Sequence, residues 1–232
     1  MRSKFCYTTF EDLVDALDAQ GIELPLSKNI AILKNSMKVK NKTIANCIAI
    51  QPMEGCDGEI NGRPSELTKR RYERFAKSGA GVIWFEAVAV VGEGRANPRQ
   101  LFINEDNLDS FKSIVYAVKK TCLEENGFEP IVIMQATHSG RYSKPNGKPE
   151  PLIAYHNPLF EKENPISKDR IVSDEYLMEL ELIMGQASNL AEQAGFDGVD
   201  IKCCHRYLNS ELLSAYTRKG EYGGSFQNRT RF

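Results

Sequence analysis

Short apolar runs alternate with helical segments from residue 47 onward. The segment Cys47–Met53 (C-I-A-I-Q-P-M) is almost continuously apolar, which is typical of a parallel strand buried on both faces. Three further runs have this character: Gly81–Val91, Ile131–Gln135 and Gly198–Ile201. Helices are predicted in the intervals, over 66–78, from Leu108 through Val118 by the spacing of apolar residues, and over 174–194. The pattern predicts a run of βα units and hence a parallel sheet.

Capping residues and glycines mark the helix ends. Ser65 and Ser173 precede two of the predicted helices, and Gly79 follows the first. Ahead of the repeats, Phe10–Gln20 has apolar residues at helical spacing, and Lys38–Thr43 is compatible with a short hairpin. We therefore expect an extension with one short helix over residues 1–37 and a βα domain over residues 38–232.

Two α/β architectures fit this order of elements. An open doubly wound sheet predicts a phosphate loop such as G-x-G-x-x-G after the first strand. The residues after Pro52 are M-E-G-C-D-G, and no helix opens on these glycines. This favours the (β/α)8 barrel, with about four of its eight βα units in the sequence.

Composition narrows the function classes. The 232 residues are 41% hydrophobic and 26% charged, which is ordinary for a globular domain. A net charge of -1 makes nucleic acid an unexpected partner, and no apolar run approaches the ~20 residues of a membrane span. The six cysteines form no C-x-x-C pair, so we expect no metal site and a reducing, cytoplasmic location.

The predicted strands end in polar residues. In a barrel the carboxyl ends of the strands meet on one face, where the chemistry occurs. The residues expected on that face are Gln51, Pro52, Met53 and Glu54, then Ala87, then Gln135, and finally Lys202, His205 and Tyr207. An amide beside a small residue suits a flat heterocycle such as a flavin, although spacing does not distinguish a flavin from other flat ligands. The ammonium, imidazole and phenol of the last group could hold and protonate a developing oxyanion.

Six blocks of the sequence resemble the old yellow enzyme family of FMN-dependent NAD(P)H oxidoreductases. They are I-A-I-Q-P-M, R-Y-E-R-F-A-K-S-G-A-G-V-I, E-A-V-A-V-V-G-E-G-R, Q-A-T-H-S-G-R, A-G-F-D-G-V-D-I and Y-G-G-S-F-Q-N-R-T-R-F. Their order is that of the family, and the similarity runs from about Lys38 to Phe232. The resemblance implies a (β/α)8 barrel with FMN at its C-terminal face and NADH or NADPH as the hydride donor.

The resemblance also implies roles for single residues. The stretch Gln51–Glu54 would pass under the flavin, Ala87 would lie close to its ring, and Gln135 would hydrogen-bond its pyrimidine edge. Lys202 and His205 occupy the positions of a histidine–histidine or histidine–asparagine pair that holds the substrate oxygen. Tyr207 matches a tyrosine that gives a proton to the substrate carbon in some members.

The sequence departs from the family at several points. Lys202 replaces the first histidine, and Glu54 stands where many members have the threonine or cysteine that tunes the flavin potential. The strands that would complete the barrel and hold the FMN phosphate are absent from the sequence. We therefore expect the second half of the barrel, or another copy in a homo-oligomer, to complete the fold, and weak FMN binding without it. An iron–sulfur cluster is expected only if a further C-terminal region exists.

The function indicated is reduction of an activated C=C bond next to a carbonyl, in an enone, enoate or enoyl thioester. Amine dehydrogenation, dienoyl-thioester reduction and a truncated, non-catalytic half-barrel stay open as alternatives.

Other polar residues have structural interpretations. Glu86 is expected to be a buried, paired carboxylate, and Cys203 and Cys204 buried packing groups. His138 and Arg141 are expected to order their loop, and His156 to lie on the surface.

Overall fold

The computed structural model describes residues 6–232, so the first five residues of the expected extension lie outside it. Its centre is a parallel sheet of four strands: β3 (Ala49–Ile50), β4 (Val82–Ala89), β5 (Ile131–Thr137) and β6 (Gly198–Ile201). The strands lie side by side in chain order, β3-β4-β5-β6. A doubly wound sheet reverses direction from its first strand, whereas a barrel adds each strand next to the last. The strand order is therefore that of a barrel.

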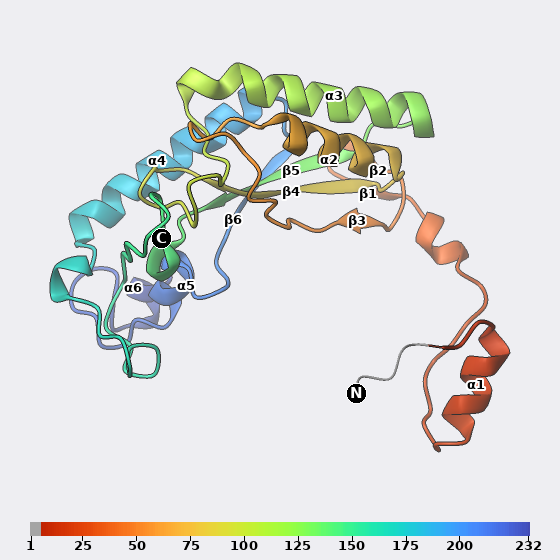
Figure 1. Ribbon diagram of the computed structural model, residues 1–232, viewed down its shortest axis with the longest axis horizontal. Helices are drawn as coiled ribbons and strands as arrows, with labels where there is room; N and C mark the ends of the chain where they lie inside the picture. Colours follow the sequence, from red (N-terminus) through yellow and green to blue (C-terminus); the bar gives the residue numbers. More distant parts are fainter. Residues whose placement is uncertain (1–5) are drawn as a thin grey trace.

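Three long helices cover one face of this sheet. They are α2 (Glu66–Lys77), α3 (Leu108–Asn126) and α4 (Asp174–Gln193), and Figure 1 shows α2 and α3 lying along β4 and β5. The predicted caps are confirmed, because the Ser65 hydroxyl accepts hydrogen bonds from two backbone amides of the first turn of α2 and Ser173 caps α4. The core lies between sheet and helices, where the Tyr72 ring of α2 stacks on Phe85 of β4 with centroids 3.9 Å apart.

The opposite face of the sheet is less covered. Side chains alternate along a strand, and on β4 and β5 the residues directed at the helices, such as Phe85 and Met134, are fully buried. Their neighbours Trp84 and Ile133 point the other way and are only half-buried. Among the described residues no helix covers this concave side in Figure 1. This is the inner face of a partial barrel.

The first strand is shorter than predicted. An apolar run over Cys47–Met53 suggested a strand of that length, but only Ala49–Ile50 pairs with β4. Within the described chain β3 is an edge strand with one neighbour, and Pro52 has no N–H to donate. Ile48 and Met53 are exposed, so the apolar run marks the inner face of an incomplete barrel.

Two small elements precede the sheet. The helix α1 (Phe10–Asp18) is capped by Thr9, and it lies apart from the sheet in Figure 1. A 3-10 turn over Ala31–Lys34 leads to the hairpin of β1 (Met37–Val39) and β2 (Lys42–Ile44), which confirms the predicted hairpin. The Lys42 ammonium pairs with Asp197, just ahead of β6, so the hairpin is fastened to the N-terminal end of the sheet.

The remaining chain forms short turns of helix. They are 3-10 segments at Glu105–Asn107, Gly140–Tyr142 and Lys168–Arg170, and the helices α5 (Leu208–Leu213) and α6 (Phe226–Arg229). The long polar segment after β5 is ordered by buried charges. Arg141 pairs with Glu161 at 2.9 Å and with Glu211 of α5, so this segment is held against the chain that follows β6.

Candidate active site

A β-bulge in β4 determines which side chains face the concave side. Phe85 pairs with Met134, but the next partner of β5, Gln135, pairs with Ala87, so Glu86 is the extra residue. Paired residues of parallel strands point to the same face. In a regular ladder without the bulge, Glu86 would pair with Gln135 and Ala87 would face the helices. The bulge therefore places Ala87 beside Gln135 on the inner face, at the carboxyl end of the sheet.

The same face continues onto β6. Gln135 pairs in register with Asp200, and the Gln135 Nε2 donates a hydrogen bond of 2.7 Å to Asp200 Oδ2. This bond fixes which way the amide of Gln135 is turned. Lys202 lies two residues beyond Asp200, and its backbone N–H donates to the Ala136 carbonyl at 3.0 Å. Ala87, Gln135 and Asp200 thus form one row across three strands, and Lys202 lies just beyond this row, after the end of β6.

Lys202 is buried, with 3% of its side chain exposed. Its Nζ lies 3.4 Å from Glu54 Oε1 and 4.6 Å from the centroid of the Tyr207 ring. The structure therefore brings together residues 148 positions apart in the sequence. A buried ammonium needs a partner to offset the loss of hydration, and a carboxylate and an aromatic face both provide one.

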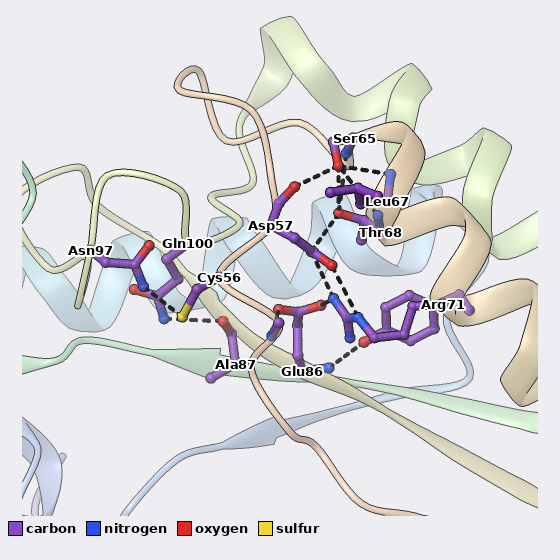
Figure 2. A network of polar contacts seen from close by, with 12 residues as sticks. Cys56, Asp57, Ser65, Leu67, Thr68, Arg71, Glu86, Ala87, Asn97 and Gln100 are labelled. Atoms are coloured by element: carbon purple, nitrogen blue, oxygen red, sulfur yellow. Dashed lines mark hydrogen bonds and ion pairs between the residues drawn. The ribbon is translucent and has the colours of Figure 1, made fainter.

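The loop that carries Glu54 is held by a network of charges, drawn in Figure 2. The Gly55 N–H donates to Glu86 Oε2 at 2.9 Å, and Glu86 Oε1 accepts a bond of 2.6 Å from Arg71 of α2. Arg71 also donates to Asp57 at 2.9 and 3.2 Å. The loop is therefore tied to the bulged residue of β4 and to α2, and Glu54 is held over the sheet.

The buried charges of this network shift one another's ionisation. Burial raises the pKa of Glu86, and Arg71 opposes only part of that rise. Burial also acts against Arg71, but Asp57 and Glu86 raise the pKa of its guanidinium. For Asp57, hydrogen bonds from Arg71 and Thr68 outweigh burial and lower the pKa. The sequence suggested Glu86 as a buried, paired carboxylate, and that interpretation is confirmed; its partner Arg71 was not foreseen.

His205 and Tyr207 lie in the turn after β6. The His205 backbone is left-handed, with φ 59°, as is that of Arg206, with φ 58°. The His205 ring meets the Tyr207 ring edge to face with centroids 6.0 Å apart, and His205 is exposed while Tyr207 is half-buried. Burial and the Glu54 carboxylate raise the pKa of Tyr207 to about 12. The phenol is therefore a proton donor at neutral pH.

The cysteines near the carboxyl end of the sheet differ from expectation in their exposure. Cys203 and Cys204 were expected to be buried packing groups, but both are exposed. The β5–β6 ladder ends where Lys202 bonds to Ala136, so the two cysteines fall in the open turn beyond it. Cys56 accepts a hydrogen bond from Asn97 at 3.2 Å, and burial with the carboxylates of Glu54 and Glu86 raises the pKa of its thiol. A raised pKa makes Cys56 a poor nucleophile.

His138 is a buried structural residue. Its Nδ1 accepts from the Gly140 N–H at 3.0 Å, so the proton of the neutral ring sits on Nε2, which lies 2.9 Å from the Tyr176 hydroxyl. Burial lowers the pKa of His138 to about 4, so the ring is neutral at physiological pH. His156, expected on the surface, is half-buried and hydrogen-bonds Glu161 at 2.6 Å.

The residues expected to pass under a flavin lie at the edge of the sheet. Gln51 and Met53 are exposed, and the Met53 N–H bonds back to the Gln51 carbonyl at 2.9 Å in a tight turn around Pro52. Met53 has 72% of its surface exposed. Gln51 and Met53 are therefore accessible to a ligand.

Over residues 6–232 no three histidine, cysteine or acidic side chains come together in a way that could hold a metal ion. The helices of this same stretch are too short or too polar to cross a bilayer.

Comparisons with known proteins match the chain over most of its length. The sequence pattern of the family described as NADH:flavin oxidoreductase / NADH oxidase matches residues 33–232. A NADPH dehydrogenase of Clostridium acetobutylicum is 30% identical over 198 residues, which are 84% of this chain and 55% of that protein. A NADPH dehydrogenase of Geobacillus sp. (strain WCH70) is 32% identical over 199 residues, with the same two shares of 84% and 55%.

The fold is also found among solved structures. The old yellow enzyme homologue from Zymomonas mobilis superimposes with a TM-score of 0.70 at 24% identity, covering 86% of this chain and 56% of that one. The chain thus spans about half the length of the curated relatives it matches. Its four parallel strands and covering helices form part of a (β/α)8 barrel. The chain belongs to the NADH:flavin oxidoreductase / NADH oxidase family, the old yellow enzyme family.

Proposed function

We propose that this chain carries the substrate-binding half of an FMN-dependent NAD(P)H oxidoreductase of the ene-reductase type, which reduces a C=C bond next to a carbonyl. The observation that carries the proposal is the pairing of Ala87 with Gln135 at the carboxyl end of the sheet, with Lys202 just beyond them on the neighbouring strand's exit. A small residue, an oriented amide and an ammonium on one face suit a planar, polar-edged ligand with an electron-rich oxygen beside it.

The residues present fit the ring of FMN. Ala87, which is fully buried in this chain, offers no side chain beyond its Cβ, so a flat ring that reached β4 would meet no bulky side chain there. The amide of Gln135 is turned by its bond to Asp200 and can meet the mixed donors and acceptors of a pyrimidine edge. The exposed Met53 would be covered by the ring. FMN bound there would supply the two-electron chemistry that no side chain of this protein can provide.

Protein residues would bind and polarise the substrate. Lys202 and His205 would hold the carbonyl oxygen and stabilise the negative charge that develops on it. Tyr207, whose pKa is raised to about 12, would hold its proton at neutral pH and give it to the substrate carbon. The packing of Lys202 over the Tyr207 ring would keep the oxygen-binding group and the proton donor in one arrangement.

The remaining βα units of a barrel would close the site. β3 and β6 each pair on one side only within the described chain, and the inner face between them is half-exposed. The occupant of this face would be the second half of a barrel or another copy of the chain. The six free thiols support a reducing, cytoplasmic location.

A second candidate is a non-catalytic binding module built on the same half-barrel. The exposed inner face favours it, because a ring held on one side only is weakly bound. The two candidates differ in whether FMN reaches Gln135.

The test is a titration of the purified chain with FMN, followed by the side-chain amide resonances of Gln135. Shifts of these resonances that saturate with FMN, and that disappear in Gln135→Leu, are expected. Gln193→Leu, at an exposed glutamine of α4, is the matched control and should leave FMN binding unchanged. No shift at Gln135 up to millimolar FMN would favour the non-catalytic module. Assays with an enone and with NADH or NADPH then test turnover.

A further inference from the structure

The ion pair between Glu54 and Lys202 joins the first and the fourth βα units across the inner face. The Nζ–Oε1 distance is 3.4 Å, and the exposed fractions of the two side chains are 3% for Lys202 and 17% for Glu54. The Lys202 ammonium also lies over the Tyr207 ring, 4.6 Å from Nζ to the ring centroid. Both groups therefore fix where the ammonium points.

The charge of Lys202 is balanced by Glu54, which contacts the ammonium. Asp200, two residues ahead of Lys202, adds a second carboxylate on the same side of the sheet, where it is bonded to Gln135. A ligand that brought a further negative charge would have to displace Glu54 and would be repelled by Asp200, and such repulsion is strong where water is excluded.

We propose that Glu54 is a positioning and specificity residue, which holds Lys202 over Tyr207 and offsets its charge so that the site takes substrates with a neutral carbonyl oxygen and rejects free carboxylates. The substrate classes selected are enones and unsaturated thioesters, and enoates are excluded. This inference rests on the proposed function for the identity of the ligand, whereas the positioning of Lys202 stands on its own.

Chemical labelling of lysine in the full chain tests the positioning. Glu54→Gln removes the charge but keeps the shape, so Lys202 should lose its ionic partner and become more mobile, and its acylation at pH 8 should speed up roughly tenfold. Glu59→Gln, at an exposed carboxylate of the same loop, is the matched control and should leave the rate unchanged. Peptide mass spectrometry resolves Lys202 from other lysines. Equal labelling of Lys202 in wild type and Glu54→Gln would overturn the positioning role.

Probe binding tests the substrate class. Cyclohex-2-enone and but-2-enoate are titrated into the chain in the presence of FMN, with ligand-observed NMR as the readout. The wild type should prefer the enone, and Glu54→Gln should gain affinity for but-2-enoate by roughly tenfold with little change for the enone. A merely structural role for Glu54 would weaken both probes together.

The outcomes separate the two proposals. Wild-type protein that binds the enoate as tightly as the enone, or an unchanged ratio in Glu54→Gln, would overturn the inferred substrate class alone. Binding of neither probe to the wild type would contradict both the substrate class and the proposed function. In that case the labelling experiment would still decide whether Glu54 positions Lys202.

Discussion

Glu86 occupies a position that a sheet core ordinarily fills with an apolar side chain. It has 1% of its side chain exposed and bonds both Arg71 and the Gly55 N–H. It therefore connects α2, β4 and the loop that carries Glu54. Such a buried pair is a weak contributor to stability as a whole, but the loss of one partner is costly because the other stays buried and charged.

Replacing Glu86 by alanine should destabilise the chain by about 3 kcal/mol, because Arg71 and the Gly55 N–H lose a buried partner. Urea unfolding measured by circular dichroism checks this. The control is Glu66→Ala, at a highly exposed carboxylate of α2, the helix that carries Arg71. It should change the unfolding free energy by less than about 0.5 kcal/mol. Similar small effects of both substitutions would show that the network does not hold the loop.

Glu161 should make the unfolding free energy depend on acid pH. Although burial acts against it, hydrogen bonds from the Asn157 N–H, His156 and Arg141 lower the pKa of Glu161 to about 2. The unfolded chain then binds the proton first, so stability is full above about pH 4.5 and falls as the pH drops towards 2. Urea midpoints at pH 2.5 and 6 measure this fall, which should be smaller in Glu161→Gln. An equal fall in both proteins would contradict the assignment.

Single residues were predictable where chemistry depends on type and position along a strand. Gln135, Ala87 and Lys202 follow from the ends of apolar runs, and the structure places Ala87 beside Gln135 with Lys202 just beyond them. The partner of Lys202 did not follow, because Glu54 lies 148 residues away and only the closure of the sheet brings it near. The prediction that Cys203 and Cys204 are buried was wrong, since no periodic pattern in the sequence marks where a ladder of paired strands ends.

At the scale of elements, local strain lies in the turns. The hairpin between β1 and β2 has Lys40 with φ 55°, in the left-handed region that favours glycine. Lys40 is exposed, so its side chain adds little to packing. The hairpin is nevertheless the element that fastens the extension to the end of the sheet, through Lys42 and Asp197.

Lys40→Gly should raise the unfolding free energy by about 0.5 kcal/mol, because it relieves the left-handed strain at a modest entropic cost. Differential scanning calorimetry should detect this as a rise in Tm of about 1–2 °C. Lys38→Gly, at an exposed residue within β1, is the control and should lower Tm, since glycine weakens a strand interior. A fall in Tm for both variants would contradict the strain at Lys40.

The number, type and order of the main elements were predictable, and their lengths less so. Helical spacing and caps located α2, α3 and α4 to within a residue or two, except that α3 runs on to Asn126. The first strand was predicted too long because hydrophobicity reports burial in the complete barrel, while pairing needs neighbours that β3 lacks here. The bulge at Glu86 was not predictable, because an extra residue in one strand is visible only against its partner.

At the scale of the whole molecule, self-association is expected at the outer edges of β3 and β6, which have no partner strand among the described residues. An unpaired strand edge presents backbone donors and acceptors to another chain. β6 carries an exposed Ile201, and the apolar side chains of the inner face are only half-buried. The 232-residue chain on its own should therefore associate with itself unless this face is covered.

Ile201→Lys should reduce self-association at micromolar concentration, because a charge on a free edge opposes strand pairing. Size-exclusion chromatography with light scattering gives the mass. Leu182→Lys, at an exposed apolar residue of α4, is the control and should leave the mass unchanged. A wild-type chain that is monomeric at every concentration, or identical behaviour of the two variants, would contradict the edge as the site of association.

The bulge in β4 has a consequence for how such a protein can change. Upstream of Glu86 the odd-numbered residues of the strand, such as Phe85, face the helices. Downstream of Glu86 the odd-numbered residues, such as Ala87, face the concave side. A substitution at Glu86 alters one contact, but a regular ladder that paired Glu86 with Gln135 would turn the whole tail of the strand over, sending Val88 inward and Ala87 outward. The register that the bulge sets is thus a stricter inheritance than the identity of any one residue, and lineages that vary the pocket are expected to change side chains there but keep the bulge.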